Sequence, residues 1–429
     1  MGIFSGENCT VKSEGAKPTY FSRFVLLALC LFLTVKALEG PVRYALVSAD
    51  IEWAIYVPTF LLMLVVLLRG LLVMHTWRIS RVMLIVTLAL LGASGLGMVL
   101  IGNPAQVLFG IYVWVPFLFG AALAQEIVPH LRRLYCFFVL LWLVSVAGVF
   151  LNYFFDWPWA GFVYKVSGIS IEGTRKWSTF GIERLAGFAR ASFEAAIIIF
   201  ILSLLLLIYG KNRWTKPAVW LIGGGAIVLT TTKGIMAAYL AVTLLLLVRP
   251  WTPAFILRAA PFVVAIVVMA FPLYSWTQDI SLILKNEVDC LLLASFEDRL
   301  TYTWPAANEL VFQHGAGPVG RGVGGIGAAQ DRFEKTLYNP ADNLFVYLFG
   351  IAGYLAVILM LLIAYRVSRF AGGRQGEATF FYLLGMGILI YGLTTNVVES
   401  AYMGMFLGIV VRSASYFGTA AVPSRLGVD

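Results

Sequence analysis

The chain has few charged residues. Asp, Glu, Lys and Arg make up 12% of its 429 residues, whereas hydrophobic residues make up 60%. That scarcity excludes an ordinary water-soluble protein, in which about a quarter of the residues are charged. Histidine and cysteine are also rare, with 3 and 4 residues. Long apolar runs are what the sequence has instead, and they place most of the chain in a lipid bilayer.

These apolar runs predict an all-α, polytopic membrane protein. A helix needs about 20 apolar residues to cross a bilayer, and the chain offers about twelve such segments. The segments 217–232 and 233–249 are short and can also be interpreted as one broken helix. The predicted spans are residues 22–48, 51–74, 81–101, 105–125, 133–155, 191–210, 217–232, 233–249, 255–275, 341–365, 378–396 and 400–420.

Lys and Arg follow an alternating pattern in the connectors between these spans. By the positive-inside rule, basic connectors lie on the cytoplasmic side. We therefore expect cytoplasmic tails at 1–21 and 421–429, and extracytoplasmic loops at 156–190 and 276–340. The same pattern explains the excess of 31 Lys and Arg over 22 acids, which gives no indication of nucleic-acid binding. The basic connector residues are Lys12, Lys17, Arg23, Arg69, Arg78, Arg81, Arg132, Arg133, Lys211, Arg213, Lys216, Arg249, Arg366, Arg369 and Arg374.

The four cysteines predict no disulfide. Cys9 falls in the cytoplasmic tail, Cys30 and Cys136 fall within spans, and Cys290 alone reaches the outer side. Since no two share an oxidising compartment, no pair can form a bond there. The first apolar run lacks a small-residue cleavage site and is followed by more membrane, so we interpret it as a signal-anchor.

The loop 276–340 concentrates charge and glycine in a chain that is otherwise poor in charge. Residues 297–311 have helical spacing, with Pro305 at a bend or in a first turn. Residues 314–327 are too rich in glycine for regular structure, and residues 330–337 predict a short helix. Asp342 or Asn343 is the expected N-cap of the following span. Long polar loops of this kind carry function more often than short connectors do.

Cations on the outer side are the first candidate functional residues. The loop 156–190 contains Arg175, Lys176, Arg184 and Arg190, against the positive-inside trend. Arginine binds phosphate oxygens with two parallel hydrogen bonds, so the cluster indicates a phosphate-bearing substrate. The alternative is a solvated loop with local ion pairs to nearby glutamates.

Lys233 and three residues of the large loop are further candidates. Lys233 lies between apolar segments, where a cation costs free energy unless it binds something or reaches the interface. Arg299 and Trp304 lie on the predicted loop helix, although Arg299 also has acidic neighbours in sequence. His314 opens the glycine segment, and a lone loop histidine is more often incidental than catalytic. We find no H-x-x-H, E-x-x-H or D-x-D pattern on the outer side, so no metal site is expected.

These candidate residues and the motifs around them follow one another along about twelve spans. In that order they resemble the pattern of the bacterial O-antigen ligase and polymerase superfamily, which are integral-membrane glycosyltransferases of lipid-linked glycan pathways. The resemblance covers most of the chain. It rests on Arg184-Leu-Ala-Gly187, on the Thr-rich segment before Lys233-Gly234, and on Arg299 with Trp304 followed by Gly315-Ala-Gly317. It also rests on Asp342-Asn343 opening a span. Asp342 stands where the ligases carry a histidine, which favours a polymerase.

The resemblance implies a glycosyltransferase in the bacterial inner membrane, and from its residues we expect it to need no metal and no cofactor. The donor that it implies is an oligosaccharide on undecaprenyl pyrophosphate, and flippase and chain-length or export proteins of the same pathway are the candidate partners. We expect a polymerase of exopolysaccharide or O-antigen repeat units. Ligation to lipid A core is the second hypothesis. A transporter or flippase of lipid-linked sugars is the third, although transporters usually show repeat symmetry. The expected roles are pyrophosphate binding by Arg184, Arg190, Lys233 and Arg299, and general-base catalysis by Asp342 or, as second choice, His314.

Overall fold

The computed structural model describes residues 19–76, 81–166, 169–179, 181–212, 214–278, 287–373 and 376–417. Most of the two predicted tails, together with Cys9, Arg78, Arg213 and Arg374, lies outside these ranges. The side chain of Cys290 is likewise outside the described part. Cys30 and Cys136 are free thiols.

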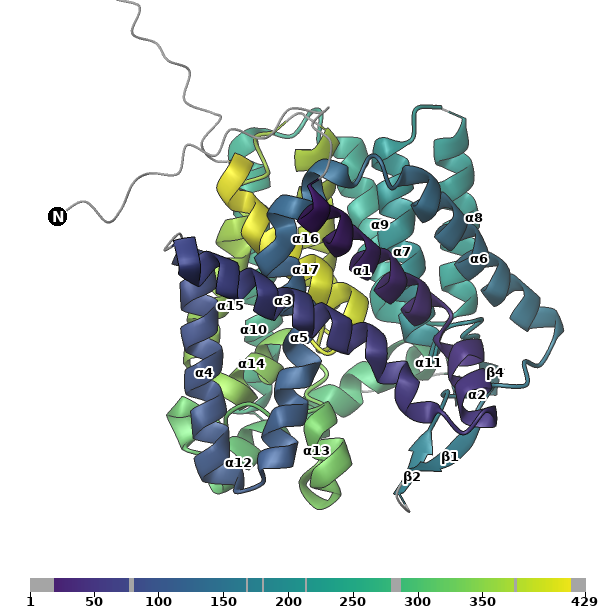
Figure 1. Cartoon of the computed structure of the whole chain (residues 1–429). Coiled ribbons are helices and arrows are strands. Elements are labelled where there is room, and N and C mark those ends of the chain that lie inside the picture. The colour runs from purple at the N-terminus through teal and green to yellow at the C-terminus, as the bar shows by residue number, and fades with distance from the viewer. Residues whose placement is uncertain are drawn as a thin grey trace, which may run out of the picture.

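The described chain is a bundle of helices (Figure 1). Seven of its helices are long and apolar enough to cross a membrane, and five shorter helices are also apolar. The protein is therefore membrane-embedded and predominantly α-helical. The helices are α1 Tyr20–Ala37, α2 Glu39–Ser48, α3 Val57–Thr76, α4 Arg81–Ile101, α5 Pro104–Ile127, α6 Tyr135–Phe154, α7 Ser192–Tyr209, α8 Thr215–Leu229, α9 Lys233–Val248, α10 Ala254–Ser275, α11 Glu287–Asp298, α12 Trp304–His314, α13 Ala328–Phe333, α14 Leu344–Ala352, α15 Leu355–Ser368, α16 Gly376–Tyr391 and α17 Ala401–Phe417.

Two predicted spans are broken in the structure. The segment 22–48 divides at Leu38, and its second half, α2, carries a buried ion pair between Glu39 and Arg43. The segment 341–365 divides at Gly353, whose φ of +57° ends α14. A Cβ on Gly353 would lie 1.9 Å from the carbonyl oxygen of Pro318, so only glycine fits there. The short segments 217–232 and 233–249 form two separate helices, α8 and α9.

Close backbone contact holds the centre of the bundle together. Helices α5 and α17 approach at Gly120 and Gly408. A Cβ on Gly120 would lie 2.0 Å from the oxygen of Met405, and one on Gly408 would lie 2.2 Å from the oxygen of Phe117. Small residues allow this approach in a membrane, where helix association depends on packing rather than on apolar burial.

The loops 156–190 and 276–340 lie at the same end of the bundle, where Figure 1 shows β1, β2, α12 and α13. The first loop forms two antiparallel hairpins, which the all-α expectation missed. They consist of β1 Val163–Val166 with β2 Ile169–Glu172, and of β3 Ser178–Thr179 with β4 Ile182–Glu183. The second loop contains α11, α12 and α13. One π turn, Arg299–Thr303, joins α11 to α12, and short 3₁₀ turns precede and follow α13. Pro305 occupies the first turn of α12 as expected.

The glycine segment 315–327 is irregular, as predicted, but from Gly320 to Gly327 it is buried inside the bundle rather than exposed as a loop. Val323 donates its N–H to the oxygen of Ala93 on α4 at 2.9 Å. Gln106 on α5 donates its side-chain N–H to the oxygen of Gly324 at 2.9 Å. A Cβ on Gly322, whose φ is +83°, would lie 2.2 Å from the backbone nitrogen of Gly97. The segment therefore fills a gap between helices that only glycine backbone fits.

Candidate functional site

Four of the residues selected from the sequence come together at the loop-bearing end of the bundle. They are Arg184, Lys233, Arg299 and Asp342, and we call them the outer cluster. Arg299 Nη2 lies 2.9 Å from Asp342 Oδ2. Arg184 and Arg299 are both near enough to Lys233 to repel its charge. The cluster thus combines three cations with one carboxylate, contributed by loop 156–190, α9, the π turn and the turn before α14.

Arg184 is positioned by the second hairpin. Its backbone N–H bonds to the oxygen of Trp177 at 2.9 Å, and the N–H of Leu185 bonds to the oxygen of Leu229, the last residue of α8, at 3.4 Å. Gly187, three residues later, has a φ of +61°, and a Cβ there would lie 2.7 Å from the nitrogen of Val149. That close approach explains the glycine of the Arg-x-x-Gly pattern, because the loop must contact α6 directly after Arg184.

Lys233 begins α9 at a break between two helices. Thr231 has a φ of +51°, a strained conformation for a β-branched residue. Gly234 lies against the end of α16, since a Cβ there would be 3.0 Å from the ring of Tyr391. The Thr-rich segment therefore ends α8, turns the chain and points the N-terminus of α9 toward the cluster. The N–H groups of that first turn favour negative charge.

One asparagine links the two segments that carry Arg299 and Asp342. Asn339 donates its side-chain N–H to the oxygen of Thr303, in the turn that Arg299 begins, at 2.8 Å. Its side-chain oxygen accepts the N–H of Ala341 at 2.7 Å. Ala341 and Asp342 both have left-handed backbone, with φ values of +63° and +45°. Two successive non-glycine residues in this region store strain, which is common at functional sites.

Asp342 does not cap the following helix. Asn343 does so, because its side-chain oxygen accepts the N–H groups of Phe345 and Val346 at 2.7 and 3.1 Å. Asp342 instead turns toward Arg299 and keeps 34% of its side chain exposed. Burial raises the pKa of Asp342 above its usual value, and the Arg299 guanidinium opposes that rise. The carboxylate is therefore both accessible and held in place.

The two arginines of the cluster have unused hydrogen-bonding capacity. Within the described residues, the Nε atoms of Arg184 and Arg299 and the hydroxyl of Thr231 are buried without a partner. Burial lowers the pKa of Arg184, and repulsion by Arg299 adds to this effect. Unpaired buried donors and close cations both cost free energy. An anion bound among them would satisfy the donors and offset the repulsion.

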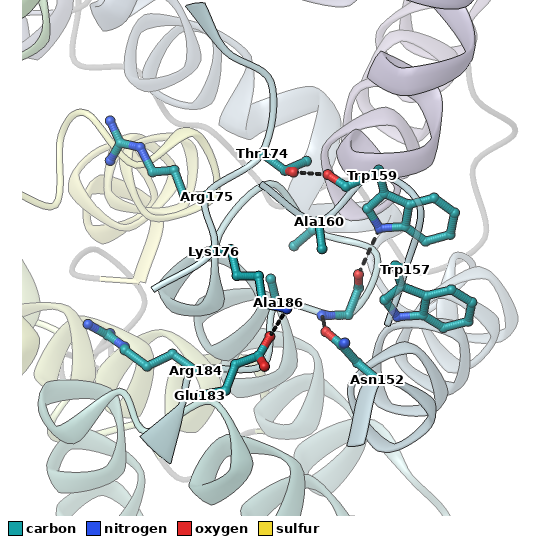
Figure 2. Close-up of a pocket in the computed structure, with 12 residues that line it drawn as sticks. Asn152, Trp157, Trp159, Ala160, Thr174, Arg175, Lys176, Glu183, Arg184 and Ala186 are labelled. Atoms are coloured by element: carbon teal, nitrogen blue, oxygen red, sulfur yellow. Dashed lines mark hydrogen bonds and ion pairs between the residues drawn. The ribbon is translucent and has the colours of Figure 1, made fainter. Parts of the chain in front are cut away.

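A small hollow lies behind Arg184. Figure 2 shows the guanidinium groups of Arg175 and Arg184 on one side of the loop and the indoles of Trp157 and Trp159 on the other. The two indoles are stacked, with ring centroids 4.8 Å apart. The cavity volume of about 10 Å³ has room for about one water molecule. This hollow is too small for a substrate, so a ligand of the outer cluster must approach from its exposed side.

Two predicted site residues lie elsewhere. Arg190 donates to the oxygen of Glu172 at 3.3 Å and acts electrostatically on the buried carboxylates of Glu39 and Glu194. His314 is exposed at the far end of α12, about 15 Å along the helix from Trp304 at 1.5 Å per residue. Its carbonyl oxygen accepts a bond from Arg321 Nε at 3.0 Å. The structure brings neither of these side chains to the outer cluster.

Trp304 and Tyr391 frame the cluster from inside. Trp304 is fully buried and packs edge-on against Phe296 at 5.7 Å, so it fixes the helix that follows Arg299. Tyr391, at the end of α16, lies within electrostatic reach of Arg184, Arg299 and Asp342. Sequence reasoning missed Tyr391 and Asn339, because an uncharged residue in an apolar run or a turn gives no signal of function.

No group of three or more His, Cys, Asp or Glu side chains that could hold a metal ion occurs among the described residues. The absence of a metal requirement stays a prediction. Comparison with models of known protein families and with curated proteins finds no match for this chain. Its function must therefore be argued from the site.

Proposed function

We propose that this protein is a glycosyltransferase that joins lipid-linked oligosaccharide repeat units into a polysaccharide. The observation that carries the proposal is the outer cluster, in which three cations, two of them arginines with an unpartnered buried Nε, lie near one accessible carboxylate. The proposed donor is an oligosaccharide on undecaprenyl pyrophosphate. The proposed location is the periplasmic face of the bacterial inner membrane, with both termini in the cytoplasm.

The chemistry needs two functions that the cluster can supply. An acceptor hydroxyl attacks the anomeric carbon, the bond from that carbon to the pyrophosphate oxygen breaks, and the lipid pyrophosphate leaves with its electron pair. Fixed cations stabilise the charge that develops on this leaving group. A base must take the proton of the attacking hydroxyl. Arg184, Lys233 and Arg299 are suited to the first function, and Asp342 is suited to the second.

The proposed topology has twelve spans. The seven long helices would cross the membrane singly. Helices α8, α9, α16 and α17 have 15, 16, 16 and 17 residues, so each rises about 22–26 Å of a hydrocarbon core about 30 Å thick. Helices α14 and α15 together would form the remaining span, broken at Gly353. In this topology Asp342 comes just before the first residue of α14, so it would lie at the periplasmic surface of the membrane.

Reconstituted protein and a pyrophosphate-linked repeat unit provide the test, with polymer length and released lipid pyrophosphate as readouts. We expect Arg184→Ala and Lys233→Ala each to abolish polymer without lowering protein level, while Lys233→Arg retains activity because charge matters most. Arg332→Ala is the matched control, since Arg332 lies on α13 against Phe109, outside the cluster. Near-normal polymer from either cluster variant, or equal loss in the control, would remove the cluster from the mechanism.

A further inference from the structure

A second cavity lies at the other end of the bundle, between α7, α8, α9 and α16. Its volume of about 580 Å³ is within the usual range of ligand pockets. Most of its wall is hydrocarbon, from Leu207 and Ile208 on α7, Trp220 on α8, and Leu246 and Leu247 on α9. We call it the inner groove.

The inner groove is separate from the outer cluster. Helix α9 starts at Lys233 in the cluster and reaches the groove between Thr243 and Leu247. These positions are 10 to 14 residues farther along, which corresponds to about 15–21 Å. The groove therefore lies at the end of the bundle opposite to α12, α13 and the hairpin of β1 and β2 (Figure 1). This is the end that carries the basic connectors of the sequence.

The walls of the groove leave little for a polar ligand to bind. The indole N–H of Trp220 bonds to Thr243 Oγ1 at 2.9 Å. That hydroxyl in turn donates to the oxygen of Tyr239 at 2.7 Å. Since these polar atoms are satisfied within the protein, the interior of the groove favours an apolar chain.

One cation lines the groove, and a second is bonded to one of its lining residues. Lys216 lines the groove directly. Arg249 hydrogen-bonds the hydroxyl of Thr379, another lining residue, and donates to the oxygen of Gly373 at 2.6 Å. Neither cation has a carboxylate partner among the described residues, and no acid lines the groove. Glu377 is the acid closest in sequence to the lining residues Gly376 and Thr379, and it lies within electrostatic reach of Tyr209.

We propose that the inner groove binds an anionic glycerophospholipid. One acyl chain fills the apolar cavity, and the phosphate lies between Lys216 and Arg249. The charge at the rim selects this occupant over a zwitterionic phospholipid, because basic pockets between spanning helices bind anionic head groups. The bonds of Arg249 to Thr379 and to the oxygen of Gly373 fix its guanidinium beside the groove, so the site is formed before the lipid arrives. This proposal does not depend on the reaction at the outer cluster.

Native mass spectrometry of the delipidated protein provides the test. Phosphatidylglycerol and phosphatidylcholine with identical acyl chains are added separately, and the bound fraction is measured. We expect at least tenfold preferential retention of phosphatidylglycerol by the wild type. Lys216→Gln should abolish the preference and leave weak retention of both lipids. Leu246→Trp, which fills the cavity without changing charge, should reduce both.

Lys211→Gln is the matched control, because Lys211 is exposed in the same connector but does not line the groove. It should keep the wild-type preference. Equal retention of the two lipids by the wild type would overturn the proposal. So would equal loss in Lys211→Gln and Lys216→Gln, which would indicate general surface attraction. Displacement of phosphatidylglycerol by an equimolar polyprenyl phosphate would identify a different occupant.

Discussion

Replacing Asp342 by Asn separates a catalytic role from a structural one. The residue has a φ of +45°, where Asn, Asp and His are the best tolerated side chains after glycine. Asn therefore keeps the backbone, and its side-chain oxygen can still accept a bond from Arg299. Ala would be a poorer test, because left-handed backbone costs about 1–2 kcal/mol for an ordinary residue.

The expected effects differ widely in size. The ion pair between Arg299 and Asp342 is partly solvated, with side chains 17% and 34% exposed. Loss of its charge should therefore lower the free energy of unfolding by only about 1 kcal/mol. A general base contributes about 10²–10⁴-fold to a rate, and Asn cannot take the hydroxyl proton. We expect polymer formation to fall by at least about a hundredfold at nearly unchanged stability.

Two further variants sharpen this test. Asp342→His supplies a base that tolerates the same backbone, so it should retain more activity than Asp342→Asn. Asp331→Asn is the control, since it removes a carboxylate from α13 in the same polar loop. The assay is the initial rate of lipid pyrophosphate release, with thermal unfolding measured in parallel. A wild-type rate in Asp342→Asn, or no gain from His over Asn, would show that the base lies elsewhere.

The remaining predictions concern charge and pH. Burial raises the pKa of Asp342, and the charge of Arg299 lowers it. Arg299→Gln should therefore shift the acidic limb of the pH–rate profile to higher pH. An unchanged limb would exclude Asp342 as the group that titrates there. Arg321 donates to both oxygens of Glu334 at 2.6 and 2.8 Å, and Arg321→Gln should cost about 3 kcal/mol in thermal unfolding because it leaves a partly buried carboxylate without its cation. Those bonds outweigh burial and lower the pKa of Glu334, so this stability should be present above about pH 4.5 and lost as the pH falls, and a pH-independent loss would contradict the assignment. Burial raises the pKa of Glu399 to about 7. The free energy of unfolding should therefore fall by on the order of 3 kcal/mol as the pH rises from about 4.5 to 7. Glu399→Gln should remove that dependence in a pH series of melting curves. Activity should survive EDTA; loss on chelation with recovery on adding a divalent ion would reveal a missed carboxylate site.

Hydropathy predicted the helical membrane class because the cost of placing polar backbone in lipid leaves few alternatives. It misjudged the segment 22–48, since the apolar average conceals Glu39 and Arg43, which pair with each other inside the protein. The hairpins of loop 156–190 were also missed. Their strands are two to four residues long, which is too short to show an alternating pattern.

Charged residues at positions where the sequence should avoid charge were the useful indication of the site. Arg184 and Lys233 were selected as cations where the sequence should avoid them, and they meet in the structure together with Arg299, which was selected on the loop helix. Arg190 satisfied the same criterion but faces Glu39 and Glu194, because sequence does not reveal toward which helix a loop side chain turns. His314 was selected because histidine is rare in this chain, but the length of α12 separates its side chain from the cluster.

The buried glycine segment explains how a loop can hold the cluster in place. Its last residue, Gly327, donates its N–H to the oxygen of Asn339 at 3.0 Å. Asn339 in turn bonds to the turn of Arg299 and to Ala341, next to Asp342. The left-handed backbone at Ala341 and Asp342 persists only if its surroundings fix it. Because the glycine segment is packed against α4, α5 and α14, the bundle itself supplies that constraint, and the carboxylate faces Arg299 without relying on a solvent-exposed loop.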